Sequence, residues 1–86
     1  MATVYFPPLL RDATGGTTHC QASGDTLRKV IAATEAQFPE LAGRLRRGDA
    51  LAPGVAASID GSFAASLLDP VGAESEVHFL PAVGGG

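Results

Sequence analysis

The chain has 86 residues, of which 45% are hydrophobic and 17% are charged, and this balance predicts one small domain with a compact core. Its formal net charge of -3 argues against nucleic acid as the main partner, because phosphate binding requires a concentrated basic surface. The single cysteine excludes an internal disulfide, and no apolar run is long enough to cross a membrane. We expect no signal peptide at Met1, and therefore a cytoplasmic, soluble protein without a membrane partner.

The first half of the chain predicts two strands followed by the clearest helix. Residues 2–6 are β-branched and aromatic, and residues 17–21 follow a Gly-Gly turn signal, which together indicate a hairpin. A helix should begin after Asp25, which we predict to be its N-cap, and should end before Pro39. The residues predicted to form its buried face are Leu27, Val30, Ile31, Thr34 and Phe38.

The segment that follows predicts a short second helix over residues 41–47, with Leu41 and Leu45 facing inward. Gly48 should end this helix, and residues 48–54 should form a loop.

The last third of the chain predicts three more strands. Residues 55–59 should form a strand, and the tight turn at Asp60-Gly61 should lead into a short return strand over residues 62–64. Residues 76–80 should form the last strand, which Pro81 ends. The resulting order of strand, strand, helix, strand, short strand, strand predicts a mixed sheet wrapped around one helix.

Inside the domain, the sequence predicts neither a catalytic centre nor a metal site. His19 and His78 have no carboxylate or cysteine at a metal-ligand spacing, and we interpret His78 as a surface residue of a strand. Cys20 has no CxxC partner and is expected to be a half-buried strand residue. We therefore predict no metal and no cofactor bound by the protein itself.

The C-terminus is the remaining candidate for a reactive site. The chain ends in Val83-Gly84-Gly85-Gly86, soon after the last predicted strand. Glycine has no Cβ, so such a tail is thin enough to pass through a narrow channel in a partner protein. Composition alone supports a frayed end equally well. We predict a domain over residues 1–81 and a flexible glycine-rich tail over residues 82–86.

These closing residues resemble the ThiS/MoaD family of sulfur carriers, whose tail motif is LPxVxGG. The motif corresponds to Leu80-Pro81-Ala82-Val83-Gly84-Gly85-Gly86, with Gly84 where many members carry alanine. At the front end, the segments Phe6 to Arg11, Thr14 to Gly16 and Ala22 to Leu27 resemble the MoaD/CysO-like branch. The resemblance implies an α+β, ubiquitin-like β-grasp fold, with a mixed sheet of four to five strands packed on one main helix.

The resemblance also implies that the protein is a co-substrate and not an enzyme. An E1-like (MoeB/ThiF-type) adenylating enzyme would use Mg-ATP to activate the C-terminal carboxylate of Gly86. A sulfur donor protein would convert the adenylate into a thiocarboxylate, and a sulfur-accepting synthase would use this sulfur to make cysteine, molybdopterin, thiamine or a secondary metabolite. Among these routes the resemblance favours a CysO-like one. The alternatives are a ubiquitin-like modifier that forms isopeptide bonds through the same tail, or a non-covalent binding module.

Partner enzymes would have to recognise the domain as well as its tail. On the last strand, Val77 and Phe79 should face the core, whereas His78 and Leu80 should face outward beside the root of the tail. The predicted partner-binding residues are His78, Leu80 and Pro81, with Tyr5 and Phe63 as weaker candidates. The residues predicted to occupy the partner's channel are Val83, Gly84 and Gly85.

Overall fold

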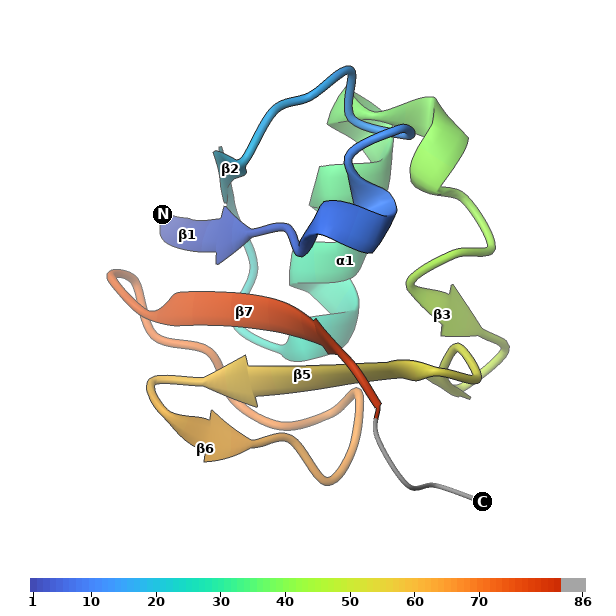
Figure 1. Ribbon diagram of the computed structural model, residues 1–86. Coiled ribbons are helices and arrows are strands. Elements are labelled where there is room, and N and C mark those ends of the chain that lie inside the picture. Colours follow the sequence, from blue (N-terminus) through green and yellow to red (C-terminus); the bar gives the residue numbers. More distant parts are fainter. Residues whose placement is uncertain (83–86) are drawn as a thin grey trace.

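A five-stranded mixed sheet packs against one α-helix in the computed structural model, which describes residues 1–82 (Figure 1). The strands follow the order β2-β1-β7-β5-β6, with β1 and β7 parallel and all other neighbours antiparallel. The sheet consists of β1 (Ala2–Tyr5), β2 (His19–Ala22), β5 (Val55–Ile59), β6 (Ser62–Phe63) and β7 (Glu76–Pro81), and the helix is α1 (Leu27–Gln37). This arrangement is the predicted ubiquitin-like β-grasp fold.

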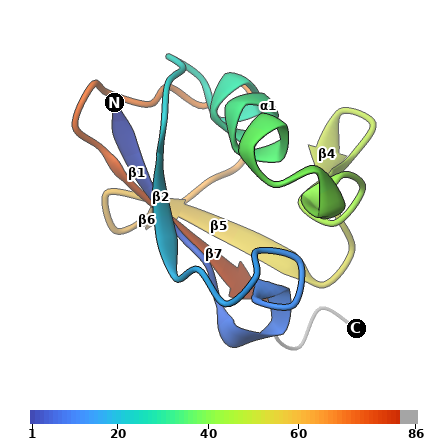
Figure 2. The same cartoon turned by 90° about the horizontal axis from the view of Figure 1, so that it is seen from above.

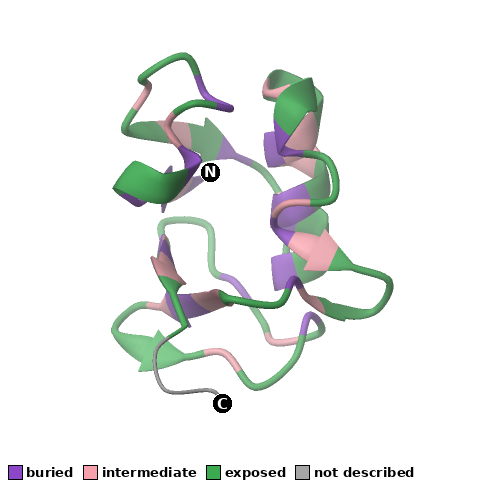
Figure 3. Ribbon diagram, turned by 45° about the vertical axis from the view of Figure 1, so that its right-hand side comes forward, coloured by how far each residue is buried: buried purple, intermediate pink, exposed green. Residues whose placement is uncertain are grey.

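The core lies between α1 and the inner face of the sheet, where buried residues of the two layers face each other (Figure 3). Alternate residues of the strands point inward, so that Val77 and Phe79 of β7 are buried as predicted. The fully buried helix residues are Leu27, Val30, Ile31 and Thr34, which repeat at helical spacing. Phe38 is only partly buried and stacks edge-on against Phe6 at 5.5 Å. The predicted core face of the helix is therefore confirmed.

The N-cap of α1 is Thr26 and not Asp25, so this part of the prediction was wrong by one residue. The Thr26 side chain accepts a hydrogen bond from the backbone N–H of Lys29 at 3.3 Å. Thr26 is still extended because it forms a β-bridge with Pro70, which delays the start of the helix. Asp25 instead forms an ion pair with the Lys29 ammonium group at 3.1 Å.

The second helix predicted over residues 41–47 is wrong. A 3₁₀ turn, η2 (Pro39–Leu41), is followed by a two-stranded hairpin of β3 (Arg46–Arg47) and β4 (Ala50–Leu51), so the predicted loop also contains a strand. Gly43, which lies between Leu41 and Leu45, and Gly48, which follows them, adopt positive φ angles of 81° and 64° that interrupt a helix. Leu41 and Leu45 are fully buried as expected, but from a turn and not from a helix.

The strand that carries the candidate site, β7, is anchored at its beginning by Asp60. This residue lies in the predicted turn with a positive φ of 50°. Its carboxylate accepts hydrogen bonds from the Ser75 hydroxyl at 2.7 Å and from the backbone N–H of Glu76 at 2.9 Å. Because both bonds favour the ionised form, the pKa of Asp60 lies below its ordinary value. The turn thus fixes the register at which β7 enters the sheet.

A second short 3₁₀ turn, η1 (Pro8–Leu10), follows β1 and buries Leu10. Within residues 1–82, no helix is sufficiently long and apolar to span a bilayer.

Candidate partner-binding face and tail root

One face of the sheet, here called the outer face, lies opposite α1 and has no α-helix over it in the described part of the chain (Figure 2). The strand register places one residue from each of the five strands in a single row across this face. The members of this outer row, in spatial order, are His19, Tyr5, His78, Ser58 and Phe63. The predicted candidates His78, Tyr5 and Phe63 are therefore brought onto one surface.

The centre of the outer row is an aromatic stack. The rings of Tyr5 and His78 lie 4.3 Å apart and are nearly parallel, with an interplanar angle of 7°. His19 lies on the other side of Tyr5, with a ring distance of 5.8 Å. The His78 Nε2 atom lies 3.5 Å from a carboxylate oxygen of Glu76. These contacts connect the side chains of three neighbouring strands across the outer face.

The outer face carries little charge. Glu76 is the one Asp, Glu, Lys or Arg residue in the strands β1, β2, β5, β6 and β7, whereas all six Lys and Arg residues of the chain lie outside these strands. Phe63 is 74% exposed at the edge of the row. Aromatic residues with few charges are typical of the centre of protein–protein interfaces. The outer face therefore has the composition of a docking surface for another protein.

The root of the tail continues this face. Leu80 is half-buried and lies opposite Ala56, and Pro81 is exposed and lies opposite Val55. His78 and Leu80 alternate with the buried Val77 and Phe79, so both point outward as predicted.

The predicted channel residues Val83, Gly84 and Gly85, and the predicted reactive residue Gly86, lie outside the described residues. Their roles stay predictions, as does the assignment of residues 82–86 to a tail.

Cys20 is the single cysteine of the chain. Its side chain lies on β2 toward the core and is half-buried, as predicted. Burial raises the pKa of the thiol, because a buried thiolate would lose its hydration. No group of three His, Cys, Asp or Glu residues within residues 1–82 could hold a metal ion.

His19 belongs to the outer row but was not among the predicted partner-binding residues. It lies on a different strand from His78, and the two meet across Tyr5 only because β1 pairs with both β2 and β7. The polar segment of residues 17–21 gave no signal of this neighbour.

The family model described as the ThiS family matches residues 4–86. The chain belongs to the ThiS family. This match includes the terminal glycines, so the predicted resemblance is confirmed. Sulfur carrier protein CysO of Mycobacterium tuberculosis is 36% identical over 92 residues, covering 98% of this chain and 97% of CysO.

The fold is shared with solved structures of similar length. The crystal structure of Mycobacterium tuberculosis CysO superimposes with a TM-score of 0.87 and 31% identity, covering 96% of this chain and all of that one. A chain of the Amycolatopsis orientalis BexX/CysO complex gives a TM-score of 0.89 with 27% identity, and both chains are covered completely. SAMP1 from Haloferax volcanii gives 0.76 with 25% identity, covering 99% of this chain and 98% of that one. The ThiS family match and these structures agree on the β-grasp fold.

Proposed function

We propose that this protein is a CysO-like sulfur carrier whose reactive group is the C-terminal carboxylate of Gly86. The observation that carries the proposal is the family match through residue 86 together with 36% identity to a named sulfur carrier. The carrier is then a co-substrate, and the catalytic groups belong to its partners.

The proposed reaction begins with activation, because a carboxylate is a poor acyl donor. A carboxylate oxygen of Gly86 would attack the α-phosphorus of Mg-ATP in an E1-like adenylating enzyme, which would release pyrophosphate and leave an acyl-adenylate at Gly86. A sulfur nucleophile delivered by a donor protein then attacks the acyl carbon and displaces AMP. The resulting thiocarboxylate donates its sulfur to the substrate of a synthase.

The outer row, together with Leu80 and Pro81, is the proposed docking surface for these partner enzymes. A CysO relative has been crystallised in a complex with BexX, which supports recognition by a protein partner. This aromatic surface, on which Glu76 is the one Asp, Glu, Lys or Arg residue of the strands, leads directly to the tail root. A partner bound there would therefore receive the tail next to its contact area.

The proposal is tested by the intact mass of the protein. Incubation with Mg-ATP, a ThiS-family adenylating enzyme and a sulfur source should add the mass difference between one sulfur atom and one oxygen atom. A peptide map should place this change on the C-terminal peptide. Reactions without ATP serve as the control. An authentic carrier in the same mixture serves as the positive control. If that carrier is converted while this protein keeps its original mass, the sulfur-carrier function is ruled out.

A ubiquitin-like modifier is the second candidate, and the similarity to SAMP1, the small archaeal modifier protein of Haloferax volcanii, favours it. A modifier would form isopeptide bonds between Gly86 and lysines of other proteins. Protein purified from its native cell should then appear as a ladder of conjugates, whereas a carrier should appear as the free chain and its thiocarboxylate.

Replacing Leu80 by aspartate should weaken binding of the adenylating enzyme by about 10- to 100-fold, because an unpaired carboxylate would be buried in an apolar interface. Titration calorimetry measures the affinity, and circular dichroism checks that the variant is folded. The matched control is Leu68→Asp, since Leu68 is 70% exposed and lies outside the sheet. Equal affinities of the two variants would exclude Leu80 from the interface.

A further inference from the structure

The end of β7 is held by a turn that precedes β5. Val55 pairs with Pro81, and the backbone N–H of Ala82 donates a hydrogen bond to the carbonyl of Gly54 at 2.9 Å. Proline has no N–H group, so Pro81 cannot donate to β5 itself. The Ala82–Gly54 bond is thus the last backbone hydrogen bond of the described chain. It lies immediately before the four residues that carry the proposed chemistry.

The turn over residues 52–55, here called the exit bracket, is fixed to the core. Gly54 has a positive φ of 82°, and the Val55 N–H donates to the Ala52 carbonyl at 3.1 Å. The Ala52 N–H in turn donates to the carbonyl of Leu45 at 3.0 Å. Leu45 is fully buried and Ala52 is 5% exposed. The Gly54 carbonyl therefore has a defined position relative to the core.

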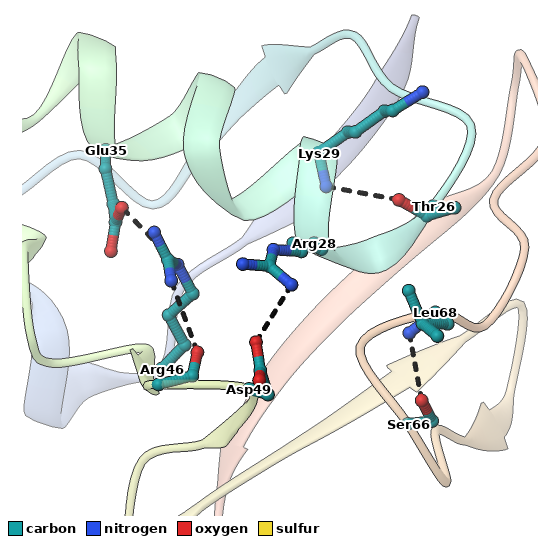
Figure 4. Close-up of polar contacts among 9 residues, drawn as sticks. Thr26, Arg28, Lys29, Glu35, Arg46, Asp49, Ser66 and Leu68 are labelled. Atoms are coloured by element: carbon teal, nitrogen blue, oxygen red, sulfur yellow. Dashed lines mark hydrogen bonds and ion pairs between the residues drawn. The ribbon is translucent and has the colours of Figure 1, made fainter.

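The hairpin that leads into the exit bracket is tied to α1 by two ion pairs (Figure 4). Arg28 contacts Asp49 at 2.9 Å on the surface, and Arg46 lies 3.9 Å from Glu35, with side chains that are 31% and 17% exposed. Arg46 also donates to the carbonyl of Gly48. The exposed Arg28 pair contributes little stability, whereas the more buried Arg46 pair is less screened. A continuous set of contacts thus connects the helix to the exit bracket.

We infer that the exit bracket is a positioning element, which sets the direction in which the chain leaves the sheet toward the active site of its partner. This inference rests on the proposed function. Four residues beyond Ala82 reach at most about 14 Å, so the direction of the root determines which points the Gly86 carboxylate can reach. Fixing the root raises the effective concentration of the carboxylate at the adenylation site of a docked partner.

The test removes the Ala82 donor without shortening the chain. In Ala82→Pro, kcat for ATP-dependent activation should fall about fivefold, the effect typical of one hydrogen bond. KM should stay within about twofold of the wild type, because the outer face still docks. Ala82→Ser keeps the N–H group and should retain about half of the wild-type rate or more. Thermal unfolding of each variant separates this effect from a loss of stability.

A wild-type kcat in Ala82→Pro would overturn the inference, as would equal losses in the proline and serine variants. The isolated protein gives a second measurement that needs no enzyme. Its Ala82 amide should exchange with solvent at least about tenfold more slowly than an unstructured amide. An unprotected Ala82 amide would show that the hydrogen bond from Ala82 to Gly54 does not hold in solution, and the inference would be rejected. A wild-type chain that is never activated, but has a protected Ala82 amide, would instead reject the proposed function and leave the bracket as a structural feature.

Discussion

Deletion of Gly85 and Gly86 should reduce ATP-dependent activation to background while leaving the domain folded. The deletion removes the carboxylate that would attack ATP and moves the new chain end back by two residues, or about 7 Å. Every contact of the outer row and the exit bracket lies within residues 1–82 and should persist. Pyrophosphate release and intact mass measure the loss, and the midpoint of thermal unfolding should change by less than about 2 °C.

The shortened chain should also compete with the wild type for the adenylating enzyme, because it keeps the docking surface. This competition distinguishes a lost substrate group from a lost interface. Gly84→Ala is the matched variant, since the family resemblance places alanine at this position in many members; it should remain a substrate. Full activity of the deletion variant would reject the carrier and the modifier together, because both require the same terminal glycine.

Gly24→Ala should destabilise the domain by about 2–4 kcal/mol, a large part of the stability expected for a chain of this size. Gly24 has a φ of 147°, and an added Cβ would lie 2.8 Å from both the Cβ of Lys29 and the backbone nitrogen of Val30. The nitrogen belongs to the first turn of α1 and cannot move without disturbing the helix. Chemical denaturation monitored by circular dichroism measures the change.

The matched control for Gly24 is Gly43→Ala. Gly43 also has a positive φ, of 81°, but an added Cβ would meet no atom within 4 Å. The free energy of unfolding of this variant should therefore fall by only about 1 kcal/mol, which is the cost of placing a residue with a Cβ at a positive φ angle. If both variants lost equal stability, the close approach of Gly24 to α1 would not explain the destabilisation of Gly24→Ala.

The elements with strong local patterns were predictable from the sequence. The helical repeat of Leu27, Val30, Ile31 and Thr34 identified the buried face of α1. The alternation in β7 correctly placed Val77 and Phe79 inside and His78 and Leu80 outside. Each of these patterns is carried by neighbouring residues, because helical and strand periodicity determine which side chains share a face.

Where local signals conflicted, the predictions failed. Residues 41–47 have two leucines at helical spacing, but the backbone conformations of Gly43 and Gly48 interrupt the helix. Asp25 and Thr26 are both good cap residues, and the bridge between Thr26 and Pro70 decided which of them begins the helix. Tertiary contacts thus overrode two locally reasonable choices.

The fold class, the outward side chains of the last strand and the glycine-rich end that matches the ThiS family could all be predicted from the amino-acid sequence. Only the tertiary structure placed Tyr5 between His19 and His78, because the parallel pairing of β1 with β7 joins the two ends of the chain. The hydrogen bond from the Ala82 N–H to the Gly54 carbonyl was likewise found only in the tertiary structure. Such pairings depend on how the whole core packs, which no short segment of sequence encodes.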